Sequence, residues 1–256
     1  MDNLIELLEK QKKTSFEAYL CGEHLSPLNM YKDLKGTIAF RNLDLALADA
    51  TFSEIPETFW DTNYEYKYYL NEDPYIPKNW NYVHKRDFNY DFSKPRFIKE
   101  LIALEKEAKE NPAKAAENYL KLGHAFFNCS YWGNSWMMTS YGMSSSEPYS
   151  SYSDLLFGAQ YPQRQKMQEG NYYYCRVAKK YYEKALAAKH DNEQGATASM
   201  MVHSCDYLAY EAKGFGIYEK RKDFVAGNAI QDFFGKYSDT DVFRRMRCGG
   251  LERFVD

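Results

Sequence analysis

The stretch AENYLKLGHAFFNCSYWGNSW, residues 116–136, decides the fold that this sequence predicts. Apolar and aromatic residues recur at steps of four, three and four, starting from the residue just before this stretch: Ala115, Tyr119, Leu122 and Phe126. This spacing places them on one face of an α-helix. Gly123 lies within the same helix, where a side chain would push away any second helix that packs close. The stretch therefore predicts one helix of a closely packed pair.

The end of this stretch, YWGNSW at 131–136, is a compact aromatic cluster without helical periodicity. Tyr131, Trp132 and Trp136 form either a stacking platform for a sugar or peptide ring or a part of the hydrophobic core. Asn134 and Ser135 add polar groups that a purely apolar core would avoid. The sequence leaves both interpretations open.

Length and composition exclude some classes of protein. The chain has 256 residues, enough for one large or two small domains, and its aromatic content of 17% includes 24 tyrosines. A net charge of −3 and a pI near 6.0 argue against a general nucleic-acid binder, which needs a basic face. No apolar run approaches the roughly 18 residues of a membrane span. The composition is typical of a folded protein with amphipathic rings at its surfaces.

No motif in the sequence indicates catalysis or metal binding. The five cysteines are far apart and lack the spacing of zinc ligands, so we expect most of them to be small apolar core residues. The signatures G-x-S-x-G, H-E-x-x-H, G-x-x-x-x-G-K-[ST] and G-x-G-x-x-G are absent. We therefore predict a protein that is not an enzyme and has no cofactor or metal, with a hydrolase as a remote alternative.

Helical patterns also precede the central stretch. Four apolar residues predict a first helix that ends near Gly22: Leu4, Leu8, Phe16 and Leu20. Pro27 opens a second helix with one apolar face, which carries Tyr31, Leu34 and Ile38. Residues 59–92 then show neither helical nor strand periodicity in their apolar residues. Such a long irregular segment is either a functional loop or a cover over helix faces. Ser93 starts the next clear helix.

The partner helices of two pairs follow from a shared spacing of small-x3-aromatic-x2-small. If Gly36 takes a close-packing position like that of Gly123, its partner helix carries Ala48, Phe52 and Ile55. The helix at 171–189 carries Ala178, Tyr182 and Ala185 and pairs with the Gly123 helix. A third pair is predicted from two further sets: Met201, Ser204, Cys205 and Leu208, followed by Ala226, Ile230 and Phe233.

These registers resemble tetratricopeptide-repeat proteins, because Tyr119-x2-Leu122-Gly123-x2-Phe126 has the spacing of the first helix in such a repeat. The resemblance implies an all-α fold, an α-α superhelix of antiparallel helix pairs with long irregular insertions, in a single domain over 1–256. The expected parts are units at 28–56, at 116–128 plus 171–190 and at 195–237, insertions at 60–92 and 137–170, and a closing helix at 239–255.

A narrower resemblance rests on FFNCSYWGNSW, on DNEQGATASMMVHSC and on the KYSDTDVF…GGLERF ending. These segments look like a little-characterised group of gut-bacterial proteins with a YYGNSW-like motif, repeat-type helices and an exported, lipid-anchored parent chain. The resemblance implies a periplasmic or cell-surface location. The N-terminal MDNLIELLEKQKKTSF departs from it, since it predicts an amphipathic helix and not a signal peptide.

In a helical-repeat superhelix the first helix of each pair lines the concave surface. The positions predicted to face this groove are Thr37, Phe40, Arg41, His124, Asn128, Asp206 and Tyr210. Each of them alone is equally compatible with an ordinary half-exposed helix residue. We predict a non-enzymatic scaffold that holds a protein or peptide partner in the groove, with segment 60–92 lying against or beside it. The alternative is a glycan-binding module whose platform comprises Tyr131, Trp132, Asn134 and Trp136.

Overall fold

A computed structural model describes residues 1–60, 73–76, 93–141, 170–214, 224–225 and 227–246. Within these ranges the regular structure is entirely helical, so the all-α prediction is confirmed. The helices are α1 (Asp2–Glu9), α2 (Ser15–Tyr19), the π-helical turn η1 (Leu20–His24), α3 (Leu28–Arg41), α4 (Leu45–Ser53), α5 (Lys94–Glu110), α6 (Ala115–Asn128), the 3₁₀ turn η4 (Trp136–Met138), α9 (Asn171–Tyr174), α10 (Arg176–Ala187), α11 (Asn192–Gly214), α12 (Asn228–Lys236) and α13 (Asp241–Met246).

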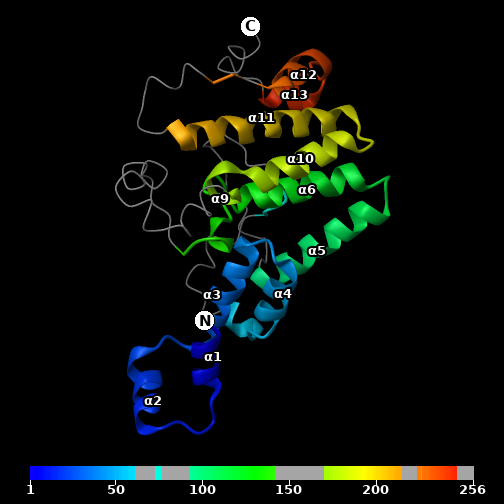
Figure 1. The fold of residues 1–256 in the computed structure, drawn as a ribbon. Helices are drawn as coiled ribbons and strands as arrows, with labels where there is room; N and C mark the ends of the chain where they lie inside the picture. The colour runs from blue at the N-terminus through cyan, green and yellow to red at the C-terminus, as the bar shows by residue number, and fades with distance from the viewer. Residues whose placement is uncertain (61–72, 77–92, 142–169, 215–223, 226, 247–256) are drawn as a thin grey trace.

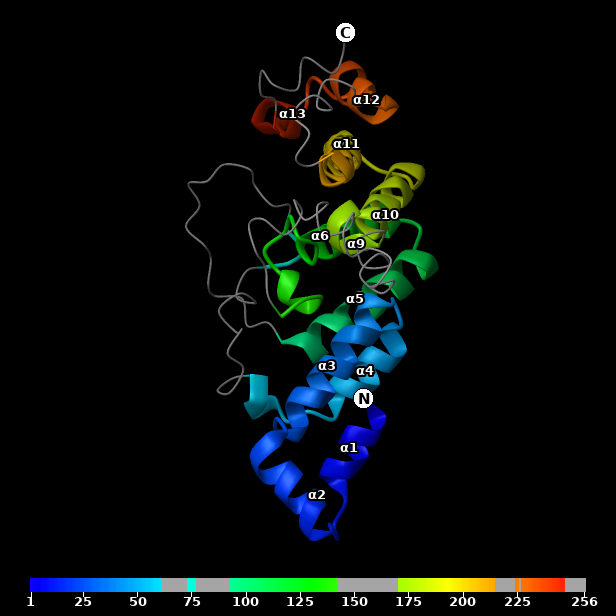
Figure 2. The same ribbon diagram turned by 60° about the vertical axis from the view of Figure 1, so that its left-hand side comes forward.

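The helices stack in chain order into an elongated molecule (Figures 1 and 2). The α1–α2 hairpin lies at one end, followed by α3 with α4, then α5, α6, α10 and α11, and finally α12 with α13. The most extensive contacts join α6 to α10, α10 to α11 and α3 to α4. Packed helix pairs are thus the building units.

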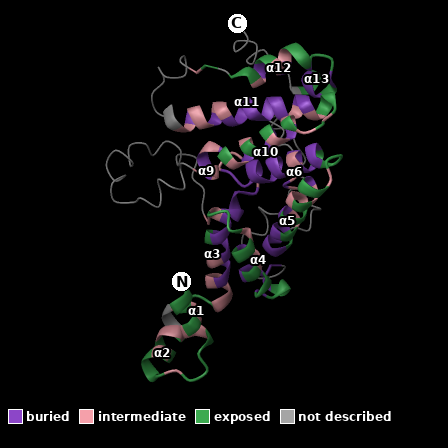
Figure 3. Cartoon of the chain, turned by 45° about the vertical axis from the view of Figure 1, so that its right-hand side comes forward, coloured by how far each residue is buried: buried purple, intermediate pink, exposed green. Residues whose placement is uncertain are grey.

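Two hydrophobic cores hold this stack together. The larger one runs from α3 through α6 and α10 to α11, and the smaller one joins α11 to α12 and α13. Burial is concentrated where α6, α10 and α11 face one another, whereas α1 and α2 contain no buried residue (Figure 3). The middle of the stack is therefore the best-packed part.

Two glycines make the close helix contacts that the sequence predicts. A Cβ added to Gly36 would lie 2.5 Å from a ring carbon of Phe52, and a Cβ on Gly123 would lie 2.5 Å from a ring carbon of Tyr182. Real Cβ atoms do not approach so closely, because carbon atoms repel well beyond this distance. The pairing of α3 with α4 and of α6 with α10 is confirmed in this register.

The third pair uses a different register from the predicted one. Ile230 and Phe233 of α12 pack with Ala196 and Met200, near the start of α11. Cys205, in contrast, packs into the larger core with α10. The 23-residue helix α11 is long enough to contact α10 and α12 with different faces, so spacing alone did not reveal which face serves which neighbour.

The N-terminal expectation of one helix is wrong, because a new helix, capped by Thr14, starts at Ser15. The Thr14 hydroxyl accepts the Glu17 backbone N–H at 3.2 Å, and the Glu17 carboxylate accepts the Thr14 N–H at 2.7 Å. This reciprocal capping satisfies donors at the start of α2 and separates it from α1. The expected helix at 171–189 is likewise divided, at Cys175, whose left-handed backbone (φ 49°) separates α9 from α10.

The buried face of α3 is also not the predicted one. Tyr31 and Leu34 are only half-buried and Ile38 is exposed, whereas Asp33 and Thr37 are completely buried. Polar side chains can occupy a core only if they are hydrogen-bonded, and these two are. The apolar pattern therefore misidentified the face.

Several other expectations can be compared with the described residues. Cys129, Cys175 and Cys205 are buried and free, as expected for core cysteines, and Cys248 lies outside the described residues. Of the expected closing helix at 239–255, α13 covers 241–246 and the residues after it also lie outside. In the described part of the chain, no helix combines the length and apolarity needed to cross a bilayer.

Gly123→Ala is expected to lower the free energy of unfolding by about 1–3 kcal/mol, the usual cost of overpacking. The Tyr182 ring has little freedom to move away, since it is fully buried and bonded to His124. Chemical denaturation measures the effect. The matched control is Gly235→Ala in α12, where an added Cβ meets no atom within 4 Å. We expect the control to be neutral or stabilising by up to about 1 kcal/mol; equal effects of the two substitutions would contradict the close contact.

Candidate functional site

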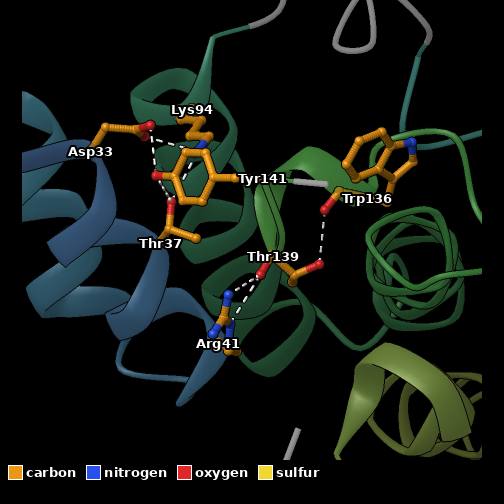
Figure 4. Close-up of polar contacts among 7 residues, drawn as sticks. All are labelled: Asp33, Thr37, Arg41, Lys94, Trp136, Thr139 and Tyr141. Atoms are coloured by element: carbon orange, nitrogen blue, oxygen red, sulfur yellow. Dashed lines mark hydrogen bonds and ion pairs between the residues drawn. The ribbon is translucent and has the colours of Figure 1, made fainter. Parts of the chain in front are cut away.

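A ring of four polar side chains, three of them buried and the fourth, Tyr141, half-buried, lies between α3, α5 and the segment after η4 (Figure 4). Asp33 and Thr37 are one turn apart on α3, Lys94 is the first residue of α5, and Tyr141 follows η4. Lys94 and Asp33 form an ion pair at 2.8 Å in which both side chains are fully shielded from solvent. The ring thus joins three parts of the chain that are distant in sequence.

Each hydrogen bond of this ring has one defined donor and one defined acceptor. The Lys94 ammonium donates to Asp33 Oδ1 at 2.8 Å and to Thr37 Oγ1 at 2.9 Å. The Tyr141 hydroxyl donates its hydrogen to Asp33 Oδ2 at 2.7 Å. The 3.0 Å contact between the Thr37 and Tyr141 oxygens is therefore donated by Thr37. Both oxygens of the carboxylate and both hydroxyls are used, as a buried polar network requires.

Burial dominates the electrostatics of the ring. Loss of water lowers the pKa of Lys94, although the neighbouring Asp33 carboxylate opposes this change. Burial, followed by the Asp33 charge, raises the pKa of Tyr141, so that this phenol stays protonated as a donor. The Lys94 ammonium also lies 4.9 Å from the centre of the Tyr141 ring, a favourable cation–π distance. The ring is thus held by charge as well as by hydrogen bonds.

Arg41 extends the same stripe of α3 by one more turn. Its Nε donates to the backbone carbonyl of Thr139 at 3.0 Å, and its Nη2 donates to the same oxygen. Partial burial lowers the pKa of the guanidinium. No carboxylate among the described residues pairs with it. The guanidinium therefore holds a backbone carbonyl at the end of η4 and not an acidic side chain.

Asn128 plays a comparable part on α6. Its Nδ2 donates to the carbonyl oxygens of Pro74 at 2.8 Å and of Ile76 at 2.9 Å. The Asn128 side chain is fully buried beneath these residues. The turn that follows α6 passes close to it, since a Cβ on Gly133 would lie 2.2 Å from the Asn128 Cα. The glycine of the YWGNSW motif thus allows the chain to double back over the end of α6.

His124 lies one turn before Asn128 but has a different role. Its Nδ1 forms a 2.8 Å hydrogen bond with the Tyr182 hydroxyl of α10, and the imidazole is buried. Burial lowers its pKa from 6.5 to about 3, so the ring is neutral at physiological pH. His124 fixes the α6–α10 pair and presents no side chain to solvent.

The seven predicted groove residues therefore do not line one open strip. Four of them are buried: Thr37, Phe40, His124 and Asn128. Phe40 lies between the rings of Phe97 and Phe126. On α11, Asp206 accepts a hydrogen bond from Lys179 at 2.6 Å, and Tyr210 packs on Phe224. The expectation of an open face is wrong for the four buried positions, because the chain itself covers α3 and α6.

The four residues of the predicted aromatic platform differ in exposure. Trp136 is buried, as a core residue would be, whereas Tyr131, Trp132 and Asn134 are half-exposed. The Trp132 indole N–H donates to the Tyr173 carbonyl at 2.8 Å, and its ring meets that of Tyr131 edge-on at 5.0 Å. Trp136 is thus withdrawn from any surface platform, and the other three residues keep polar and apolar edges at the surface.

Sequence reasoning missed Asp33, Lys94 and Tyr141. The spacing of Asp33, Thr37 and Arg41 at four-residue steps was a usable sign of a polar stripe on α3. Nothing in the local sequence distinguished Lys94 from other lysines, because its partner lies 61 residues away. No family model matches this sequence, and neither the curated proteins nor the solved structures contain a significant match. The geometry of the site is therefore the only basis for a functional proposal.

Removal of one member of the buried ion pair is expected to destabilise the fold severely. Lys94→Met or Asp33→Leu leaves an uncompensated buried charge, and we expect each to cost about 3–5 kcal/mol of unfolding free energy. The double variant Lys94→Met/Asp33→Leu removes both charges and should cost less than the sum of the two. A double-mutant cycle from urea denaturation measures this coupling, and strict additivity would contradict the ion pair.

The buried imidazole predicts a loss of stability in mild acid. Between pH 6.5 and about 3 the unfolded chain binds a proton at His124 that the folded protein excludes, so the unfolding free energy falls as pH falls. From pH 7 to 5 this contribution is about 2 kcal/mol. His124→Asn should reduce the pH dependence by that amount. Tyr182→Phe should retain it, because burial and not the hydrogen bond lowers the pKa; an unchanged slope in His124→Asn would contradict the assignment.

Proposed function

We propose that the protein is a non-enzymatic scaffold that binds a non-helical segment of a protein partner on the face formed by α3 and α6. One observation carries the proposal: polar side chains of this face hold the backbone of non-helical segments. Arg41 holds the Thr139 carbonyl, and Asn128 holds the Pro74 and Ile76 carbonyls. Backbone carbonyls are common to every polypeptide, so the same donors suit a segment from another chain.

The chemistry of the two side chains favours peptide capture over catalysis. A guanidinium presents several N–H donors in a fixed fork, and a carboxamide donates two hydrogens while it keeps an acceptor oxygen. Neither group is a nucleophile or a general base. Both project from rigid helices, so their donors are positioned before a partner arrives, which lowers the entropy cost of binding.

A tetratricopeptide-like arrangement of the helix pairs is part of this proposal. The contacts of Gly36 with Phe52 and of Gly123 with Tyr182 support it, since both pairs use the same small-against-aromatic register. Stacked helical repeats place equivalent faces of their first helices side by side and form extended binding surfaces. The different register between α11 and α12 limits the regular part to the first two pairs.

Glycan binding is the alternative function, favoured by the half-exposed aromatic edge after α6. Tyr131 and Trp132 present partly exposed rings beside the amide of Asn134. Aromatic faces with nearby polar groups suit sugar rings. We rank this alternative second because the indole N–H of Trp132 is already bonded to the Tyr173 carbonyl.

A peptide library displayed on phage and a glycan array, probed with the same protein, distinguish the two functions. We expect selected peptides to bind saturably and the double variant Arg41→Ala/Asn128→Ala to bind them at least about tenfold more weakly, since two hydrogen-bond donors to a peptide backbone are lost. Lys109→Ala, on the exposed surface of α5, is the control and should bind as the wild type does.

Circular dichroism and thermal melting must first show that the double variant is folded. Unchanged peptide affinity in the folded double variant would contradict the proposed surface. Saturable glycan binding that Trp132→Ala abolishes, without any selected peptide, would establish the alternative function instead.

A further inference from the structure

The short segment Asp73–Ile76 is organised like a bound peptide motif. The Asp73 carboxylate accepts the Tyr75 backbone N–H at 2.8 Å, which closes a turn over Pro74. Aspartate followed by proline favours such a turn, because the carboxylate bonds the backbone two residues on and proline fixes its own φ. The segment thus holds its bent shape with its own residues.

This turn is seated in a cradle made by Asn128 of α6 and Phe97 of α5, which we call the Asn128 cradle. Pro74 is buried, and the Tyr75 ring lies 5.8 Å from the ring of Phe97. The Asn128 carboxamide donates to the carbonyls on either side of Tyr75. Ile76 is 57% exposed. Two carbonyls and one aromatic ring are therefore the features that the cradle recognises.

One polar atom of the cradle is not satisfied by this turn. The Oδ1 atom of Asn128 is buried and has no hydrogen-bond partner among the described residues. A buried acceptor without a donor costs about 1–3 kcal/mol. Because both Nδ2 hydrogens are directed to carbonyl oxygens, the orientation of the amide is fixed and Oδ1 remains free to accept an N–H. The cradle thus offers one more hydrogen bond than Asp73–Ile76 uses.

We propose that the Asn128 cradle is a docking site for a short motif of a partner protein, with the pattern acidic residue, proline, aromatic residue, aliphatic residue. Asp73–Ile76 is the copy of this motif within the chain and competes for the same site. The inference deepens the proposed function, on which it rests, by naming the class of partner. The partner motif forms the same turn and inserts its aromatic ring against Phe97. An N–H of a partner residue outside the turn supplies the hydrogen bond to Asn128 Oδ1 that Asp73–Ile76 does not make.

Competition within the chain determines how the site must be tested. A segment tethered close to its site has an effective concentration in the millimolar range, so a free peptide with micromolar affinity hardly displaces it. Binding is therefore measured on a motif-disabled variant that carries Asp73→Gly, Pro74→Ser, Tyr75→Gly and Ile76→Ser. A capped, fluorescein-labelled peptide with the sequence NEDPYIPK, residues 71–78, is the probe, and fluorescence anisotropy is the readout.

We expect saturable binding of this peptide to the motif-disabled variant and at least tenfold weaker binding to the wild type. Asn128→Asp added to the motif-disabled variant should abolish binding, because a carboxylate has no N–H to donate and repels carbonyl oxygens. A peptide with alanine in place of its tyrosine and a scrambled peptide should not bind. If the motif-disabled variant does not fold, Tyr75→Ala replaces it, since that substitution withdraws only the ring from Phe97.

No saturable binding to a folded motif-disabled or Tyr75→Ala variant would overturn the inference, and so would binding that Asn128→Asp leaves unchanged. Failure here is distinguishable from failure of the proposed function. If library peptides of other sequences still bind the wild type and lose affinity in Arg41→Ala, the scaffold function stands and only the motif is wrong. If neither probe binds, both proposals are wrong.

Discussion

The buried ion pair between Lys94 and Asp33 is the interaction on which the arrangement around α3 depends. A charge without water must be neutralised and fully hydrogen-bonded, and here Thr37 and Tyr141 complete that requirement. Because the four groups come from α3, from the first residue of α5 and from the segment after η4, none can move without exposing an unsatisfied partner. Apolar packing alone would tolerate small shifts between these elements, whereas this ring specifies a single arrangement of them.

This constraint also places the donors that hold the backbone carbonyls of non-helical segments. Arg41 lies one turn beyond Thr37, so the ring that holds Tyr141 brings the Thr139 carbonyl to the guanidinium. Asn128 ends α6, whose position is set by the contact of Gly123 with Tyr182 and by the bond from His124 to the same tyrosine. The elements that close the core therefore also direct these polar side chains at the segments that cover them.

In the proposed function, occupation of the face by the chain itself changes how a partner would bind. A partner does not meet an empty groove, but a surface on which the Pro74–Ile76 segment and the residues Thr139–Tyr141 already take the hydrogen bonds. The net binding free energy of a partner is then the difference between its own binding free energy and that of the internal segment. The high effective concentration of the tethered segment lowers the partner's apparent affinity further. A surface of the proposed kind would select partners that make more contacts than the internal segment, which favours specificity over affinity.

The sequence by itself determined the all-helical fold, most of the longer helices and two of their pairings. The periodicity of apolar residues identified α6. The spacing of a glycine on one helix and an aromatic residue on the next identified the contacts of α6 with α10 and of α3 with α4. This was possible because a glycine at a close helix contact is visible in the local sequence. Only the tertiary structure decided the register of α12 on α11, the buried polar face of α3 and the burial of His124 and Asn128. Each of these depends on partners tens of residues away: Lys94 reaches Asp33 across 61 positions, and Asn128 reaches Pro74 across 54. Local pattern places a residue on a helix face, but only the long-range chain path decides what covers that face.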